Sequence, residues 1–590
     1  MEEKISLKYI LKLLLKNKKY LILGQIVTII AILISIPIPL MLPVLVDEVL
    51  LEKPAGFVET ISSIFGSGDG FYYIAIVTVA VILLRLIHFV FTVIITKIFT
   101  KISKYVTYEI RVKLLKHLEL VNMNEYESLG SGAITSNLIT DVNTLDNFII
   151  SIASKFIASI LTLLAVAIVI IAIDPILGLM ILCIQPIIML LSKKISKKTG
   201  HLKKEENQAV EKFQDNVGET LELFGQIKAS NKENYFFNEA VDKASNIRKK
   251  SNEFNYKSVA YERFSFTIFL IAFEIFRATG LVLVAYSDLS IGMMFAMFGY
   301  IWFIMTPVQD ILTIQYSYAS ANAAINRINK ILDLSLEKNG DKKLCDNTKE
   351  VDILVKDLNF SYNEEKTILE NINFEIKAKQ KVALIGASGS GKTTLAQVIS
   401  GFYSKNSGQI HYNNLNIDEL NRQSLRENIF LVLQMPILFN NTLRFNITMG
   451  NENISDEQIY KALRIAQLHD TVTKMQDGLD TIVGRHGVRL SGGQRQRLSI
   501  ARMVIANPAV VIFDESTSAL DVHTEAKLFT SLTPILENKT VITIAHRLST
   551  VKNADIIYVL DEGKIVQSGS HEELEDEEGH YLEFVKNQLI

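Results

Sequence analysis

A glycine-rich turn between a strand-like and a helical segment is the strongest chemical signal in this sequence. The segment KVALIG runs into GASGSGKTT and then LAQVIS, which fits G-x-x-x-x-G-K-[ST] in the required strand–loop–helix setting. Glycines let backbone N–H groups turn inward around a phosphate, and the helix N-terminus adds a favourable dipole. Lys392 is expected to reach the β- and γ-phosphates of a nucleotide, and the Thr393 hydroxyl to hold Mg²⁺. The predicted phosphate cradle consists of Gly386, Ala387, Ser388, Gly389, Ser390, Gly391, Lys392, Thr393 and Thr394.

A pair of carboxylates ends a second apolar segment, VVIFDES. A buried strand that ends in two carboxylates directs them to the edge of the sheet where ligands bind in α/β folds. Asp514 is placed to contact the Mg²⁺ shell, and Glu515 to orient or deprotonate an attacking water. The plain alternative is an acidic turn in solvent.

A third cluster, LSGGQRQRLSIARMVIANP, lies just upstream. Ser491, Gly492, Gly493 and Gln494 open a predicted helix and form a second anion-binding helix N-terminus. One nucleotide cannot use two phosphate sites far apart on one domain. Two such domains that face each other head to tail, each closing the other's nucleotide, are the simplest solution.

The elements that must carry these clusters follow a long apolar region. Hydrophobic residues make up 49% of the 590 residues and charged residues 21%. A helix needs about 20 mainly apolar residues to cross a bilayer, and buried helices of a soluble protein rarely form so many uncharged runs. Six membrane spans are therefore predicted, at about 21–46, 71–96, 147–173, 175–192, 264–286 and 290–314.

Lysines set the orientation, because cytoplasmic loops carry an excess of basic residues. They follow spans 2 and 4, so both termini are expected in the cytoplasm. The lysine-rich residues 1–20 read as an amphipathic elbow helix on the membrane surface. Beyond about residue 350, short β-rich runs alternate with helical patterns, which predicts an α/β domain on a largely parallel sheet. The expected fold is thus multi-domain: an all-α six-helix transmembrane domain (21–330), a linker (331–350) and an α/β P-loop nucleotide-binding domain (351–590).

Charge and cysteine usage exclude other classes. The net charge of −2 gives no reason to expect a nucleic-acid partner. The two cysteines, Cys183 and Cys345, lie in an apolar segment and a polar connector, so neither a disulfide framework nor a Cys-based zinc site is in view.

Together these motifs resemble the ATP-binding-cassette (ABC) transporters, and the resemblance covers essentially the whole chain. LSGGQ at 490–494 resembles that family's signature, and SALD at 518–521 its D-loop. The resemblance implies that Tyr362 stacks on adenine, that Gln434 senses Mg²⁺, and that His546 contacts the γ-phosphate. It implies ATP and Mg²⁺ as cofactors, Glu515, His546 and Gln434 as catalytic residues, and Thr393, Gln434 and Asp514 as metal ligands.

The membrane half resembles the exporter-type subfamily of half-transporters, which includes P-glycoprotein, lipid A flippases, and multidrug and peptide exporters. Short coupling helices are expected near Asn124–Glu127 and Ile227–Glu233, the second docking on a partner's cassette in relatives. Arg485 stands where relatives usually carry a glutamate before the signature. This reversed charge indicates either a re-paired contact, with Glu125, Glu127 or Glu233, or a tolerated surface substitution.

Ionisable residues within the spans are the candidates for cargo contact, because such groups are costly in a bilayer and usually mark function. Arg85 and His88 in span 2 are three residues apart, as are Glu274 and Arg277 in span 5, and the two pairs lie at similar depth. A structural lock, with Arg85 paired to Glu274 within or across a dimer, competes with a polar lining of the cargo cavity. Span 6 adds a mixed aromatic and polar stripe, formed by Trp302, Gln309, Asp310, Gln315, Tyr316 and Tyr318.

The sequence therefore predicts an ATPase coupled to membrane transport that exports amphipathic cargo (peptide, drug or lipid) as a homodimer, since every cassette motif is intact on this chain. The expected location is a bacterial-type inner membrane with the ATPase domain in the cytoplasm. An importer for siderophore-like cargo and an ATP-gated channel or regulatory ATPase are the alternatives; the intact Glu515 and signature oppose the latter.

Overall fold

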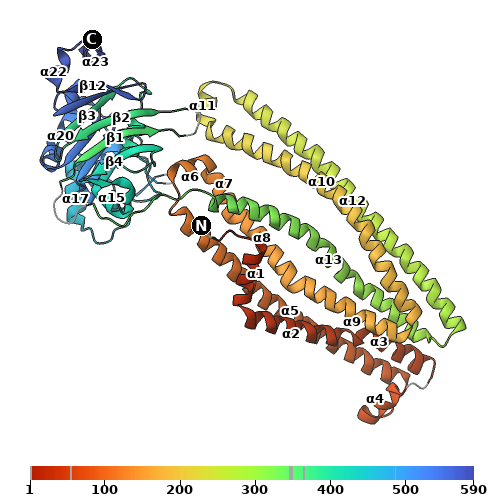
Figure 1. Cartoon of the computed structure of the whole chain (residues 1–590). Coiled ribbons are helices and arrows are strands. Elements are labelled where there is room, and N and C mark those ends of the chain that lie inside the picture. The colour runs from red at the N-terminus through yellow and green to blue at the C-terminus, as the bar shows by residue number, and fades with distance from the viewer. Residues whose placement is uncertain are drawn as a thin grey trace. The chain divides into compact units, whose positions relative to one another are not determined.

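The computed structural model describes residues 3–53, 56–344, 350–362, 366–484, 487–545 and 547–589, without the side chains of 181–197, 199, 262, 265, 312, 315, 316, 549 and 587–589. The chain forms two compact units (Figure 1). Unit 1 comprises Met1–Leu118 and Gly132–Asp333, and unit 2 comprises Glu119–Ser131 and Leu334–Ile590. His546 and Arg485 lie outside the described residues.

Unit 1 is helical in every one of its named elements. Apolar residues at nearly every position of its long helices leave most of their surface hydrophobic, which is typical of helices that face lipid. Its elements are α1 (Leu7–Lys16), α2 (Lys18–Ser35), α3 (Pro37–Pro43), the π-helix η1 (Val44–Leu50), α4 (Phe57–Phe65), α5 (Gly70–Leu118), α7 (Ser131–Ser136), the π-helix η2 (Asn137–Asp141), α8 (Val142–Ile150), the π-helix η3 (Ser151–Phe156), α9 (Ile157–Ile173), α10 (Pro175–Glu222), α11 (Phe224–Ala229), α12 (Glu233–Tyr286) and α13 (Ile291–Leu332).

Five helical stretches among the described residues are long and apolar enough to cross a membrane: Lys18–Leu50, Gly70–Leu118, Ser131–Ile173, Glu233–Tyr286 and Ile291–Ile311. They coincide with five of the six predicted spans. The remaining predicted span, 175–192, lies in α10, and most of its side chains fall outside the described residues. The spans continue as helices far beyond a bilayer's thickness, because α10 and α12 run for 48 and 54 residues.

The prolines of the first span break it into α2, α3 and η1, since each proline lacks the N–H that would continue the helical ladder. Tyr300 of α13 donates its hydroxyl to the carbonyl of Ile36 at this break, at 2.5 Å. This hydrogen bond ties α13 to the break in the first span.

Asp47 of η1 caps the first turn of α13. Its carboxylate accepts from the Ser290 hydroxyl at 2.5 Å and from the Gly292 N–H at 2.9 Å, and it is 7% exposed. A carboxylate at a helix N-terminus is stabilised by the dipole and by the unpaired N–H groups. A side chain on Gly292 would begin 2.4 Å from Asp47 Oδ2 and 2.6 Å from the Pro43 Cα, so glycine is required at this crossing.

Unit 2 has three sheets among the described residues: two large ones form its frame, and β7 and β8 make a small antiparallel pair. The larger has the order β12-β11-β3-β10-β9-β6, in which β12 alone is antiparallel to its neighbour; the smaller is antiparallel with the order β2-β1-β4-β5. The strands are β1 (Ile353–Phe360), β2 (Leu369–Ile376), β3 (Lys381–Gly386), β4 (Ser407–Tyr412), β5 (Leu415–Asn416), β6 (Ile429–Val432), β7 (Asn441–Thr442), β8 (Ile482–Val483), β9 (Val510–Asp514), β10 (Thr540–Ile544), β11 (Ile556–Asp561) and β12 (Lys564–Gly569).

Helices cover these sheets and add a second, largely helical lobe. Buried residues of β9, such as Val511 and Phe513, pack against Leu528 and Leu532 of α20. The helices of unit 2 are α6 (Met123–Leu129), α14 (Lys392–Ile399), α15 (Arg422–Asn428), α16 (Leu443–Thr448), α17 (Asp456–Ile465), α18 (His469–Thr473), α19 (Gly492–Ala506), α20 (Val522–Leu536), α21 (Leu548–Val551), α22 (His571–Glu575) and α23 (His580–Leu589), with the 3₁₀ turns η4 (Ile417–Glu419) and η5 (Gly478–Asp480). The predicted fold class, a helical membrane region followed by an α/β domain, is confirmed.

Candidate active site

The parallel strands of the larger sheet bring the predicted catalytic segments to one edge. β3 leads into the glycine-rich loop, β6 precedes Gln434, and β9 ends at Asp514. The pairing of β6 with β9 and of both β9 and β3 with β10 is parallel, so their carboxyl ends lie at the same edge. This edge is where α/β sheets bind ligands.

The glycine-rich loop has the backbone that a phosphate cradle needs. Gly386, Gly389 and Gly391 have φ values of +147°, +83° and +102°. A side chain on Gly386 would begin 2.0 Å from the Leu560 carbonyl oxygen, so the loop closes against β11 only with glycine. Gly391 is the N-cap of α14 and leaves that helix's first N–H groups to the loop.

Lys392 is folded into this loop. Its ammonium donates to the carbonyls of Gly386 at 2.9 Å and Ala387 at 2.8 Å, and the residue is 5% exposed. Burial lowers the pKa of Lys392, although Glu515 and Asp514 act in the opposite direction. A cation held in a buried loop by carbonyl groups gains further stabilisation from a phosphate anion.

The predicted metal ligands lie together. Thr393 donates its hydroxyl to Asp514 Oδ1 at 2.9 Å, and Gln434 donates its amide N–H to Glu515 Oε2 at 2.6 Å. One hydroxyl, one buried carboxylate and one amide are oxygen donors of the kind that Mg²⁺ prefers beside substrate phosphates, so these residues fit the ion.

Glu515 follows β9 in a left-handed conformation, with φ +44°. This conformation costs energy for a non-glycine residue and is concentrated at functional positions. It turns the chain sharply, so that consecutive carboxylates serve different partners: Asp514 contacts Thr393, and Glu515 contacts Gln434.

Tyr362, which follows β1, lies beside the phosphate loop. Its hydroxyl is 3.1 Å from Thr394 Oγ1, and its ring packs edge-on against Phe360 and Tyr403. The residue is 43% exposed, which leaves ring surface available for stacking on a base.

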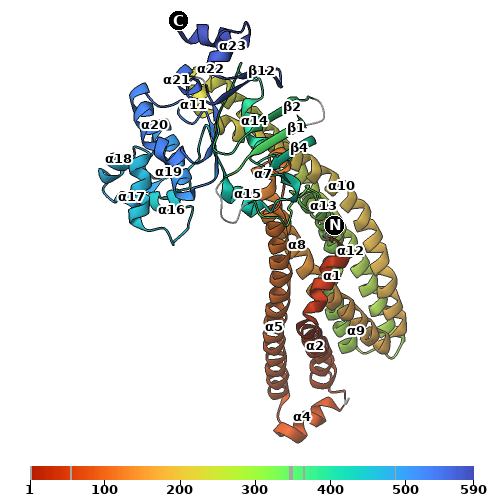
Figure 2. The ribbon, with the colours of Figure 1, turned by 60° about the vertical axis from the view of Figure 1, so that its left-hand side comes forward.

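The signature segment forms a capped helix N-terminus. Ser491 accepts from the Gln494 N–H at 3.2 Å, and the Gln494 side chain accepts from the Ser491 N–H at 2.8 Å. Gly493 packs against the Ala519 carbonyl, and α19 lies apart from α14 in Figure 2. The signature therefore belongs to a second surface of the unit, away from the phosphate loop of the same chain.

Comparison with known proteins agrees with this geometry. A family model described as "ABC transporter" matches residues 369–518, and one described as "ABC transporter transmembrane region" matches residues 21–308. An ATP-dependent lipid A-core flippase of Legionella pneumophila is 30% identical over 497 residues, which cover 83% of each chain. The chain belongs to the ABC transporter family.

Two further proteins are similar to this transporter. A putative multidrug export ATP-binding/permease protein of Staphylococcus aureus is 32% identical over 488 residues, covering 81% of the transporter and 83% of that protein. The solved structure of a bacterial Atm1-family ABC exporter with ATP bound superposes with a TM-score of 0.82 at 22% identity, covering 97% and 100% of the two chains. The fold is thus the exporter fold, and the predicted ATPase coupled to membrane transport is confirmed.

Sequence reasoning missed Gln496 as part of the transporter's site. It is 4% exposed and donates to the Gln434 carbonyl at 3.1 Å and to Ser518 Oγ at 3.2 Å, while it accepts from the Ala519 N–H at 3.1 Å. It joins the signature helix to the segments that follow β6 and β9. A glutamine five positions into an otherwise apolar helix face was the available signal.

Tyr403 was also missed. Its hydroxyl contacts both carboxylate oxygens of Glu127, at 3.1 and 3.0 Å, and its ring packs edge-on against Tyr362 at 5.3 Å. Glu127 lies in α6, the first predicted coupling helix. A single side chain therefore contacts both Tyr362, the predicted adenine-stacking residue, and the predicted coupling helix of unit 2.

The ionisable residues of the spans are arranged differently from the predicted lock. Glu274 forms an ion pair with Arg277 on its own helix. Within one chain, the described Glu274 thus has Arg277 and not Arg85 as its ion-pair partner. A pairing of Arg85 with Glu274 across a dimer stays a prediction.

The other predicted cargo residues have identifiable contacts. His88 Nδ1 lies 3.0 Å from the Ala31 carbonyl, and Asp310 pairs with Lys155 at 3.8 Å. Trp302 is 50% exposed and packs against two phenylalanines of α12. The side chains of Gln315 and Tyr316 lie outside the described residues.

Proposed function

We propose that this ABC transporter exports amphipathic cargo as a homodimer, with the ATPase unit in the cytoplasm of a bacterial cell. The observation that carries the dimer is the capped N-terminus of α19, which lies apart from the chain's own phosphate loop. A second copy, facing the first head to tail, would close each nucleotide between the phosphate loop of one chain and Ser491, Gly492 and Gly493 of the other.

The residues of one cassette divide the work of hydrolysis. Lys392 would move from the loop carbonyls to the β- and γ-phosphates, and Tyr362 would hold the adenine. Mg²⁺, when bound through Thr393, Gln434 and Asp514, would neutralise phosphate charge. Glu515 would orient the attacking water and take its proton. His546 is proposed to contact the γ-phosphate on the basis of its motif, TIAHRLS.

Two similarities support the cargo class and the direction of transport. The relatives' names are those of a lipid A-core flippase and of a putative multidrug export protein. The exposed ring of Trp302 and the half-exposed Glu274–Arg277 pair supply aromatic and charged contacts of the kind such cargo needs.

The first experiment tests hydrolysis and cargo. Glu515→Gln is expected to keep ATP binding and to lower turnover in reconstituted vesicles by orders of magnitude. In the wild type, lipids, peptides or drugs that are cargo should stimulate the ATPase. Near-normal turnover of Glu515→Gln would refute the role of this carboxylate.

The second experiment tests the shared sites. A Lys392→Ala chain and a Ser491→Arg chain are each expected to be inactive. When they are mixed, the head-to-tail arrangement leaves one intact site, formed by the phosphate loop of one chain and the signature of the other. Single-turnover hydrolysis in affinity-selected mixed dimers measures it. If each nucleotide were served by one chain alone, no site would be intact and no hydrolysis would be recovered.

A further inference from the structure

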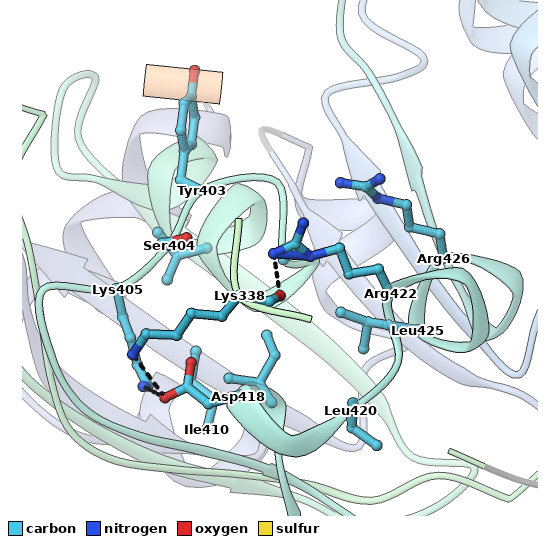
Figure 3. A pocket seen from close by; sticks show the side chains of 13 residues that line it. Lys338, Tyr403, Ser404, Lys405, Ile410, Asp418, Leu420, Arg422, Leu425 and Arg426 are labelled. Atoms are coloured by element: carbon cyan, nitrogen blue, oxygen red, sulfur yellow. Dashed lines mark hydrogen bonds and ion pairs between the residues drawn. The ribbon is translucent and has the colours of Figure 1, made fainter. Parts of the chain in front are cut away.

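A hollow in unit 2, formed by residues outside the proposed ATP site, is lined by basic side chains. It lies between the segment that follows α13, the turn after α14, and α15, and it holds about 490 Å³ including space continuous with solvent. Figure 3 shows the basic groups around it. They are Lys338, Lys405, Arg422 and Arg426.

These four cations share two carboxylates. Lys338 and Lys405 both contact Asp418 Oδ2, at 3.6 and 2.6 Å. Arg422 and Arg426 both contact Glu337. Arg426 donates to the two carboxylate oxygens of Glu337 at 2.8 and 2.9 Å. The cluster of six side chains therefore has a formal charge of two positive units.

Two of the cations are largely removed from water. The side chains of Lys405 and Arg422 are 10% and 16% exposed. Burial lowers the pKa of Arg422, with Glu337 acting in the opposite direction. An arginine stays protonated in proteins, and Arg422 donates both to Glu337 and to the Lys338 carbonyl, so an added anion would further offset its charge.

We propose that this hollow binds a phosphate-bearing anion. Guanidinium groups donate in a planar fork that matches phosphate oxygens, and lysine ammonium groups add point charges. Two positive charges match a phosphate dianion, while the Ser404 hydroxyl on the wall is already donated to Asn122 Oδ1. The phosphate of a lipid headgroup and free phosphate present the same chemistry.

The position of the hollow gives its ligand a route to coupling. Ser404 and Tyr403 line it, and these residues contact Asn122 and Glu127 at either end of the α6 segment. Binding would bear on the docking of α6 and so on coupling between hydrolysis and transport; this consequence rests on the proposed function, whereas the binding itself does not.

The test is equilibrium dialysis of ³²P-phosphate against the full chain in phosphatidylcholine nanodiscs, with Mg²⁺ and a non-hydrolysable ATP analogue filling the nucleotide sites. Saturable binding is expected, and Lys338→Gln and Arg426→Gln should each weaken it roughly ten- to hundredfold, as the loss of a charged hydrogen bond predicts. Both side chains are more than half exposed, so the variants should fold. Lys338→Arg, which keeps the charge, should retain binding.

Lys342→Gln is the matched control, because Lys342 does not line the hollow and forms an ion pair with Glu419 at 2.9 Å. It should bind phosphate like the wild type. A second arm uses nanodiscs that contain phosphatidic acid. If the protein is stabilised against thermal unfolding in these nanodiscs but not by free phosphate, and Arg426→Gln abolishes that stabilisation, the ligand is a lipid headgroup. The proposal is overturned if neither phosphate source binds above a chloride control of equal ionic strength. It is equally overturned if Lys342→Gln weakens binding as much as Lys338→Gln does.

Discussion

Tyr403→Phe isolates one hydrogen bond between the cassette and α6, the predicted coupling helix. The change keeps the ring that packs against Tyr362 and removes only the hydroxyl that contacts both oxygens of Glu127. A hydrogen bond to a charged group contributes about 1.5–3 kcal/mol. Tyr403 is 6% exposed, but Glu127 is exposed, so water replaces part of the lost bond. We therefore expect a loss of about 1 kcal/mol in the docking of α6, a factor of roughly five.

Hydrogen exchange measured by mass spectrometry reports this docking directly. Amide exchange in the peptide that contains Met123–Leu129 should become about five times faster in Tyr403→Phe, because local opening sets the exchange rate. Glu127→Gln should have a similar effect, and the double variant should add little to either single change. Tyr460→Phe, on the distant helix α17, is the control and should leave the peptide unchanged. Unaltered exchange in Tyr403→Phe, or effects that add fully in the double variant, would refute the reasoning.

Three further outcomes are expected. Tyr362→Ala should weaken ATP binding by about 1–3 kcal/mol, which is the contribution of one stacked base, and Tyr362→Phe should weaken it less. Calorimetric titration with ATP measures both losses, and equal losses would contradict a stacking role. Asp141→Asn should lower the thermal unfolding midpoint, because Arg327 contacts this 3% exposed carboxylate at 2.5 Å, and Arg327→Met in the same chain should recover part of the loss. Because water in the proposed cargo cavity would solvate the charge left behind, Glu274→Gln should change the unfolding midpoint little but alter cargo-stimulated ATPase activity. A large loss of folded protein would mean that the pair is a structural lock.

The catalytic segments could be predicted from sequence because each is a local pattern with its own structural setting. The glycine loop, Asp514 and Glu515, and Ser491 all lie where a strand ends or a helix begins, and their types suffice to indicate phosphate, metal and water chemistry. The parallel sheet then brings the glycine loop and the two carboxylates to one edge, whereas Ser491 lies at the start of α19 and not at this edge.

What could not be predicted depends on contacts between distant parts of the chain. Tyr403 and Glu127 are 276 positions apart, and neither carries a pattern that points to the other. Helical spacing placed Arg85 and Glu274 at similar depth, but depth does not say which helices are neighbours. In the structure Glu274 has its partner three positions along its own helix. The sharing of Glu337 and Asp418 by four cations likewise emerges only when the segment after α13 lies on α15.

The contact between Asp47 and the start of α13 constrains how unit 1 can deform. The carboxylate fixes both the rotation and the height of α13 relative to η1, and the absence of a side chain at Gly292 lets the two backbones touch. Sliding or twisting at this crossing would break both hydrogen bonds and leave the Gly292 N–H without its acceptor. We therefore expect η1 and the start of α13 to move together as one rigid segment. A hinge that opens a path for cargo is then expected elsewhere along these helices.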